Sequence, residues 1–202
     1  MAKTTVKHKT AAILGADCPA GRAIALQLVR EGCHVVLVGY DEQKLTLLSE
    51  LIQNKAGDSL QAVLPRDGDA DIAALLRPSR DQQGHFHFII NAVAAAEGPS
   101  DDPGAPARAA RAAIAGVLAL VEGKGNVRFI TLWPDFAGAA PDMPKEQWHS
   151  LIRVDKIQME SEHTNDDAQM VRAAAAADTI IHLLQSSPGA CPFEVRIEPR
   201  VV

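Results

Sequence analysis

The sequence has few cysteines, no long apolar run and no concentrated positive charge, and each of these absences narrows the class of protein. Its three cysteines, Cys18, Cys33 and Cys191, match neither a disulfide framework nor a zinc pattern. We interpret them as ordinary buried or half-buried thiols in a reducing compartment. No stretch reaches the roughly 18 apolar residues of a membrane span, and residues 1–10 lack a signal-peptide pattern. The expectation is a soluble, cytoplasmic protein.

Positive charge is scattered along the chain, and the formal net charge is −5. A protein that binds nucleic acid or an anionic membrane concentrates its lysines and arginines on one face. We therefore expect neither kind of partner. The length of 202 residues and the hydrophobic share of 47% fit one domain, residues 1–202, with a sizeable core.

Short apolar runs alternate with helical patterns about seven times along the chain. Such a rhythm is typical of a mostly parallel sheet with helices on both faces. Right-handed crossovers make a doubly wound, Rossmann-type α/β domain of about seven strands the expected architecture. The segment 145–159 stays open between a strand that begins at residue 152 and a partly helical structure. The other expected strands are 11–14, 35–38, 61–64, 88–90, 127–132 and 193–197, and the expected helices are 20–31, 41–52, 69–76, 107–121 and 166–184.

The turn between the first strand and the first helix is punctuated by Gly15 and Gly21. A glycine at the strand end permits a tight turn, and a glycine at the helix start permits close packing of the helix on the strand. The N–H groups and the dipole of the helix N-terminus favour a phosphate there. Two glycines six residues apart serve any such turn, so a turn without a nucleotide stays an equal alternative on spacing alone.

Four segments resemble the short-chain dehydrogenase/reductase family, in the order in which that family carries them. Residues 21–25, Gly-Arg-Ala-Ile-Ala, are similar to the start of its first helix, and residues 35–41 to its second strand. Residues 89–93 look like its Asn-Asn-Ala-Gly segment, and residues 153–157 like its Arg-Val-Asn-x-Ile strand. The resemblance covers nearly the whole chain. It implies cofactor-binding residues at Gly15, Gly21 and Asn91, retained as vestiges of a nucleotide site.

The sequence departs from the family at the cofactor positions. Leu14 stands for the family's Thr, Pro19 for its middle glycine, and Val93 for a glycine near the nucleotide. A proline has no N–H to offer a phosphate. Gly39 and Tyr40 occupy the place where the family implies an acid for NAD or an Arg for NADP. The interpretation of Tyr40 stays open between stacking on an adenine and an ordinary surface tyrosine. We expect no cofactor or weak NAD(P) binding.

The departures at the catalytic positions are larger. The family implies a Tyr as general acid/base, a Lys four residues later, a Ser and an Asn. The single tyrosine, Tyr40, is on the adenine side, and no Tyr-x-x-x-Lys occurs; Asp135 falls near the Ser position, and residues 107–121 contain no Asn. An alternative acid/base set of Asp135, His149 and Lys156 has no spacing that enforces convergence. We expect no catalytic residue.

The connection before the sixth expected strand is short. Residues 138 and 152 are only 14 steps apart, and two prolines lie between them. A parallel crossover needs at least about a dozen residues, usually with a helix. We interpret the gap as a deletion of the family's helix that carries Tyr and Lys. Trp133 and Trp148 flank it and are expected to cover the sheet, with a partner contact as the alternative.

His85 and His87 have the alternate spacing that places two rings on one face of an extended segment. A zinc site needs further ligands, and no carboxylate or cysteine nearby completes a metal site. We interpret them as histidines at a strand edge and expect no metal.

The last helix and strand are expected to form a subunit interface, which the resemblance implies. The apolar band on residues 166–184 is wider than one contact with a sheet requires. The alternative is a helix buried against its own sheet. The predicted interface residues are Met170, Ala174, Ala177, Ile181, Leu184, Phe193 and Val195.

Loss of the whole catalytic set together with its helix favours a non-catalytic subunit. Such a subunit would support or regulate a catalytic short-chain dehydrogenase in a hetero-oligomer, or would pair with itself. Two alternatives stay open. One is an NAD(P)-dependent alcohol or ketone oxidoreductase with displaced catalytic residues, and the other is a module that senses a dinucleotide without reaction. The sequence leaves open whether the chain is an enzyme and favours inactivity of the chain alone.

Overall fold

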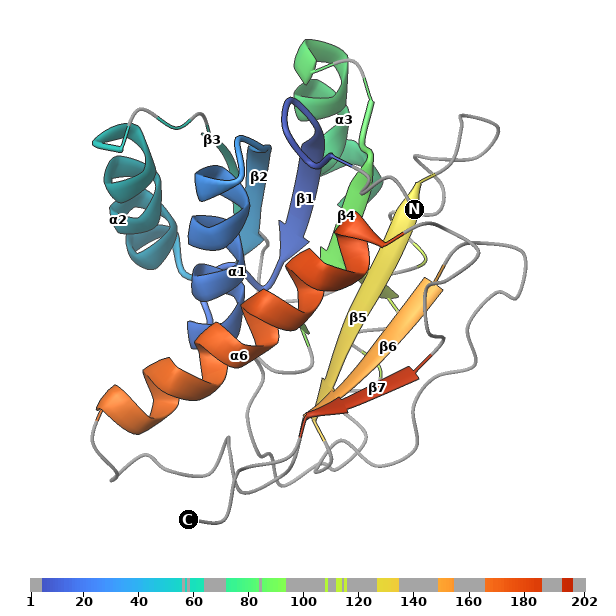
Figure 1. The fold of residues 1–202 in the computed structure, drawn as a ribbon. Helices are drawn as coiled ribbons and strands as arrows, with labels where there is room; N and C mark the ends of the chain where they lie inside the picture. The colour runs from blue at the N-terminus through green and yellow to red at the C-terminus, as the bar shows by residue number, and fades with distance from the viewer. Residues whose placement is uncertain are drawn as a thin grey trace.

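Seven parallel strands form one sheet in the part of the chain that the computed structural model describes (Figure 1). The spatial order is β3-β2-β1-β4-β5-β6-β7, which reverses direction beside β1 and so makes the sheet doubly wound, as predicted. The strands are β1 (Thr10–Leu14), β2 (His34–Gly39), β3 (Ser59–Val63), β4 (Phe88–Asn91), β5 (Arg128–Pro134), β6 (His149–Val154) and β7 (Glu194–Ile197). The described residues are 5–55, 57, 59–63, 72–83, 85–93, 108, 112, 113, 115, 127–134, 149–154, 166–186 and 194–197.

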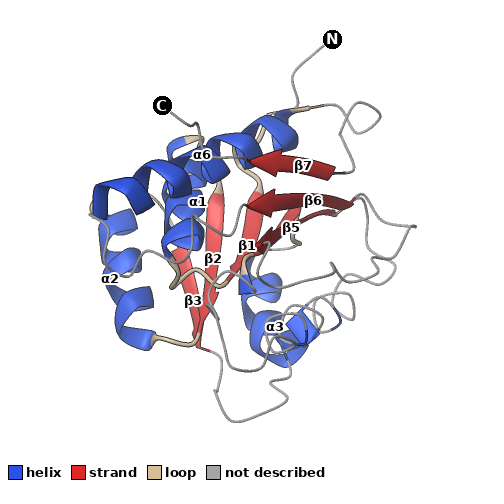
Figure 2. Ribbon diagram, turned by 90° about the horizontal axis from the view of Figure 1, so that it is seen from below, coloured by secondary structure: helices blue, strands red, loops and turns tan. Residues whose placement is uncertain are grey.

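Helices cover both faces of the sheet (Figure 2). The helices α1 (Pro19–Arg30), α2 (Glu42–Gln53) and α6 (Asp166–Gln185) pack on one face, and α3 (Ile72–Gln83) packs on the other. Strand β1 contributes to both cores, because Ala11 and Ile13 belong to the first cluster and Ala12 and Leu14 to the second. Burial on both faces explains why this strand is a continuous apolar run without alternation.

The predicted elements are confirmed, with shifts at their ends. β3 begins two residues earlier than predicted, and α3 extends to Gln83, past Pro78. β6 begins at His149, so a helical structure is wrong for residues 149–154. The four described residues of the predicted helix 107–121 are helical. Among the residues that the structure describes, no helix is long and apolar enough to cross a membrane.

The apolar stripe on α6 faces its own chain. Ala177, Ile181 and Leu184 are buried, and they join the same core cluster as Ile24 and Leu28 of α1. In Figure 1, α6 lies across α1. These three residues were predicted to contact another subunit, whereas in the structure they lie in the core of their own chain. Contact with one helix and with the sheet is enough to bury the wide stripe.

The remaining predicted interface residues are not part of the buried stripe that the structure describes. Ala174 is exposed, whereas the side chains of Met170, Phe193 and Val195 lie outside the described residues. A partner that met α6 would therefore meet the face that carries Ala174 and not the buried stripe. The interface itself stays a prediction.

One arginine fixes the C-terminal end of α6 to the sheet. The guanidinium of Arg128, the first residue of β5, donates to the carbonyl oxygens of Leu183, Leu184 and Ser186 at 2.6, 2.9 and 2.7 Å. The last carbonyls of a helix have no partner within the helix and carry partial negative charge. Arg128 satisfies them with a charged donor, and so it joins two elements 55 residues apart.

We expect Arg128→Met to lower the free energy of unfolding by about 2 kcal/mol, because charge-assisted hydrogen bonds are lost while the aliphatic stem is kept. Urea denaturation followed by circular dichroism measures the change. Arg30→Met is the matched control, since the guanidinium of Arg30 makes only an exposed 3.4 Å contact with Gln27. Equal stability of the wild type and the Arg128 variant would show that the cap contributes nothing.

Candidate functional site

The turn between β1 and α1 depends on a glycine with a left-handed backbone. Gly15 has φ +80°, and a Cβ at this residue would lie 2.8 Å from the carbonyl carbon of Ala92. Its N–H and that of Ala16 both donate to the carbonyl of Val38, at 2.8 and 2.9 Å. The turn is thereby held between the ends of β2 and β4, at the carboxyl edge of the sheet, where ligands of doubly wound folds bind.

Gly21 allows α1 to approach that turn. A Cβ on Gly21 would overlap the carbonyl oxygen of Gly15 and would lie 2.8 Å from the Cα of Ala16, so only glycine fits. The two glycines of the sequence motif are thus brought together, as predicted. Their contact is required by the packing of helix on strand whether or not a nucleotide binds.

Near the start of α1, the N–H groups of Cys18 and Gly21 already donate to acceptors within the chain. Pro19 is the first helical residue and has no N–H. The N–H of Gly21 donates to the Sγ of the N-cap residue Cys18 at 3.3 Å, and the N–H of Cys18 donates to the carbonyl of Gly15 at 3.2 Å. A phosphate at this helix end would have to replace the thiol as the acceptor, and it would find one donor fewer than in a glycine-rich turn.

The cap is a neutral thiol. Burial raises the pKa of Cys18 to about 11 against a reference of 9.0, although the N–H of Gly21 opposes this rise. Burial also raises the pKa of Cys33, to about 12, and its Sγ donates to the carbonyl of Val6 at 3.0 Å. Both cysteines are buried and free, which confirms the interpretation of them as structural thiols, whereas Cys191 lies outside the described residues.

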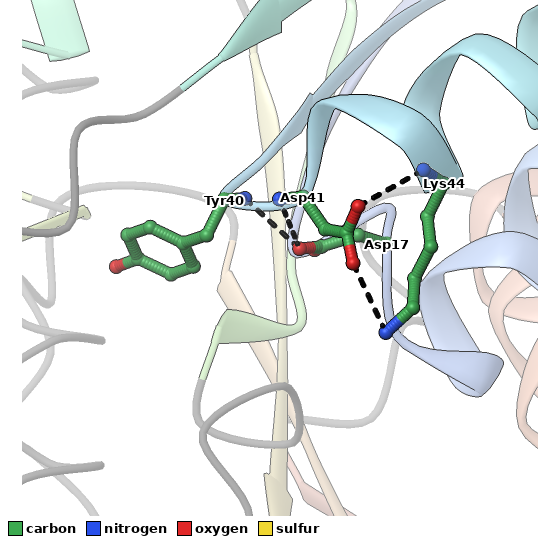
Figure 3. A network of polar contacts seen from close by, with 4 residues as sticks. All are labelled: Asp17, Tyr40, Asp41 and Lys44. Atoms are coloured by element: carbon green, nitrogen blue, oxygen red, sulfur yellow. Dashed lines mark hydrogen bonds and ion pairs between the residues drawn. The ribbon is translucent and has the colours of Figure 1, made fainter.

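Asp17 links the turn to the end of β2 (Figure 3). Its Oδ2 accepts hydrogen bonds from the backbone N–H groups of Tyr40 at 2.9 Å and Asp41 at 3.0 Å. Its Oδ1 is buried and has no hydrogen-bond partner among the residues that the structure describes. Asp41 caps α2 by accepting from the N–H of Lys44 at 3.1 Å, which holds the pKa of that carboxyl below its usual range. A carboxylate therefore lies at the place where the family carries its cofactor-selecting side chain.

Asp17 was not predicted as a site residue, because the resemblance implied an acid or an Arg at the end of β2 itself, where Gly39 and Tyr40 lie. The usable signal was the combination of an acid inside the turn and a glycine at the end of β2, since a Cβ on Gly39 would lie 2.6 Å from the Cγ of Asp17. The ring of Tyr40 points away from Asp17 (Figure 3), and it packs against the core cluster of the α3 face.

Asn91 lies at the same edge as the glycine turn. It ends β4 in register with Leu14 of β1 and Thr131 of β5. Its side chain is buried, and its Oδ1 accepts from the N–H of Val93 at 3.1 Å. The three predicted vestigial residues, Gly15, Gly21 and Asn91, are therefore neighbours, and each has a clear role in shaping the chain at this edge.

Of the alternative acid/base set, the structure describes only the backbone of His149. His149 is the first residue of β6 and so lies at the amino edge, whereas β5 ends at Pro134 on the carboxyl edge. Six strand residues separate the two edges by about 16 Å. Asp135 and Lys156 lie outside the described residues. His149 is therefore wrong as a partner for groups at the carboxyl edge. Trp133 is fully buried in the sheet, as expected of a residue that covers it, and Trp148 is not described.

His85 and His87 form a pair at the amino edge. Their ring centroids are 4.1 Å apart, and the Nδ1 of His87 accepts from the N–H of Thr10 at 3.1 Å. Burial, with smaller effects from His85 and Lys9, lowers the pKa of His87 to about 4. No group of three metal-ligating side chains occurs in the described part of the chain. The prediction of edge histidines fits this geometry, in which His87 joins β1 to β4.

The fold of this chain is similar to the folds of several short-chain dehydrogenases and reductases. No protein-family model matches it. An uncharacterized oxidoreductase of Staphylococcus epidermidis is 33% identical over 88 residues, and the match spans 44% of this chain and only 37% of that relative. A short-chain dehydrogenase from Rhodopseudomonas palustris superposes with a TM-score of 0.70 at 17% identity, over 96% of this chain and 100% of that one.

Two further structures contain bound dinucleotides. A metagenomic short-chain oxidoreductase in complex with NADP has a TM-score of 0.69 at 17% identity and covers 98% of this chain and 100% of its own. A short-chain dehydrogenase/reductase from Burkholderia phymatum in complex with NAD has a TM-score of 0.69 at 14% identity, over 96% and 90% of the two chains. The chain has the fold of the short-chain dehydrogenases/reductases, which confirms the resemblance at the level of the fold.

We expect Gly21→Ala to destabilise the protein by more than about 2 kcal/mol, because the new methyl group meets the backbone of the preceding turn and not a flexible side chain. Thermal denaturation measures the effect. Ala23→Gly in the same helix is the control and is expected to cost about 1 kcal/mol through helix propensity alone. A smaller loss for Gly21→Ala than for the control would contradict the close packing described here.

Protonation of His87 is expected to destabilise the fold in mild acid. Its pKa is about 4 when folded and 6.5 for the free side chain, so the unfolded chain takes up this proton at higher pH. The contribution is complete above about pH 6.5 and is lost as the pH falls toward 4. His87→Asn keeps an acceptor for Thr10 and should reduce the difference in melting temperature between pH 7 and pH 5. An equal difference in the wild type and the variant would contradict this role of His87.

Proposed function

We propose that the chain is a non-catalytic member of the short-chain dehydrogenase/reductase family that supports or regulates a catalytic relative in a hetero-oligomer. The observation that carries the proposal is the connection between β5 and β6. Pro134 ends one strand and His149 begins the next, which leaves the 14 residues from 135 to 148 for the whole crossover. A parallel crossover needs about a dozen residues for the return alone. The long helix that carries Tyr and Lys in the family does not fit in this length.

The composition of the chain supports the same conclusion. The only tyrosine is Tyr40, at the end of β2 and far from the position of a catalytic acid. Two donors of the β1–α1 turn, the N–H groups of Gly21 and Cys18, donate to acceptors within the chain itself. We therefore assign no catalytic residue and at most weak NAD(P) binding. Two buried free thiols support a reducing, cytoplasmic location.

The last helix and strand remain the surface that we assign to the partner. β7 ends the sheet order, so its outer edge has no strand neighbour among the described residues. An open strand edge is a common site for association of chains. The exposed face of α6, with Ala174 and Asp178, lies on the last helix before this strand. A second copy of the chain is the alternative partner for the same surface.

A second candidate function is an NAD(P)-dependent oxidoreductase with displaced catalytic groups. It is favoured by the 88-residue match to an oxidoreductase and by the bound NAD and NADP of the structural relatives. A binding module that senses a dinucleotide without reaction would share the same turn. These candidates differ from the first in whether the isolated chain transfers hydride or binds a dinucleotide.

The decisive experiment is co-purification of the tagged chain from its native cells, followed by native mass spectrometry. The expected result is a complex of fixed stoichiometry with a full-length short-chain dehydrogenase, and no oxidation of NADH or NADPH by the isolated chain at 340 nm. Ala174→Arg on α6 should weaken capture, whereas Leu47→Arg on the exposed face of α2 is the matched control. Hydride transfer by the isolated chain to any carbonyl substrate would falsify the proposal.

A further inference from the structure

Asp17 supplies an anion to a pair of backbone donors that a ligand would otherwise use. The N–H groups of Tyr40 and Asp41 point together at the end of β2, just before α2, and one carboxylate oxygen accepts from both. Two successive backbone N–H groups in a turn form a natural anion site. In a Rossmann arrangement the pyrophosphate lies at the β1–α1 turn, and the ribose of adenosine lies at the end of β2. Asp17 bridges these two places.

Gly39 makes room for this carboxylate. A Cβ on Gly39 would lie 2.6 Å from the Cγ of Asp17 and 3.1 Å from its Cβ. The side chain of Asp17 therefore fills the volume that a side chain on residue 39 would occupy. The resemblance implies an acid on β2, but in this chain the acid at that place is Asp17, which belongs to the turn. Asp17 fits there only because residue 39 is a glycine.

The surroundings of the two N–H groups are negative. Asp17 uses one oxygen for both donors, and its other oxygen is buried without a partner among the described residues. Asp41, which follows Tyr40, carries a second carboxylate, and the Nζ of Lys44 lies 3.4 Å from its Oδ2. A phosphate that approached the N–H groups of Tyr40 and Asp41 would have to displace one carboxylate and lie beside another. A neutral ribose hydroxyl meets no such repulsion and could donate to a carboxylate.

We propose that Asp17 excludes dinucleotides with a 2′-phosphate from this site, so that any dinucleotide the chain accepts is the form with a free ribose diol. The inference rests on the proposed function only in treating the turn as a former dinucleotide site. It adds a specificity-determining residue outside the strand where the family carries one. It also explains why Gly39 is needed at the end of β2.

Titration of the folded chain with NADH and with NADPH, by calorimetry or tryptophan fluorescence, tests the proposal. The wild type is expected to bind NADPH at least about tenfold more weakly than NADH, because like charges meet within a few ångströms. Asp17→Ser should lower this ratio of dissociation constants at least about tenfold by improving the binding of NADPH. Asp17→Asn, which keeps the shape and removes the charge, should change the ratio in the same direction. Circular dichroism confirms that each variant is folded.

Glu42→Gln is the matched control, since it removes one negative charge from the exposed first turn of α2 without touching the two N–H groups. It should change the ratio less than about twofold. An unchanged ratio in both Asp17 variants, or no binding of NADPH by either of them, overturns the proposal. The proposed lack of catalysis is tested separately by hydride transfer, so the failure of one leaves the other standing.

Discussion

The contact between the carboxyl end of β1 and the amino end of α1 determines the geometry of the carboxyl edge of the sheet. Gly15 turns the chain in a conformation that side chains rarely adopt, and Gly21 lets the helix meet the turn at backbone distance. The same turn lies against Ala92, so β4 is positioned by it as well. Once these three backbones touch, the place of Asp17 beside the end of β2 follows, and so does the hydrogen bond from Tyr40.

Several backbone N–H groups at the carboxyl edge of the sheet donate to side chains of the chain itself. Cys18 accepts from the first turn of α1, Asp17 accepts from the residues after β2, and Asn91 accepts from Val93. In a dinucleotide-binding reductase, a phosphate or a ribose would be expected to take up some of these donors. These internal hydrogen bonds cap the start of α1 and join the turn to the end of β2. Such internal bonding supports the proposal of a non-catalytic subunit.

The helix α6 packs against α1 and is bound to the start of β5. Its alanines let it approach α1 closely, and Arg128 holds its last carbonyls to the start of β5. The stripe of Ala177, Ile181 and Leu184 was visible in the sequence, and its apolar character was correctly identified. Its partner was not, because periodicity shows that a face is buried and does not show whether the covering surface belongs to the same chain.

The sequence by itself determined the order of strands and helices, the two glycines of the turn and the lack of a Tyr-x-x-x-Lys motif, because these follow from local periodicity, backbone freedom and residue type. Only the tertiary structure decided that Asp17 reaches the end of β2, that His149 lies at the opposite edge from the glycine turn, and that Arg128 caps α6. Each of these contacts joins elements that are distant along the chain or depends on where a strand begins. The turn of Gly15 and Gly21 suggested a phosphate site from its sequence. In the folded chain, the thiol of Cys18 accepts from the N–H of Gly21 at this place, and the carboxylate of Asp17 reaches from the turn to the end of β2.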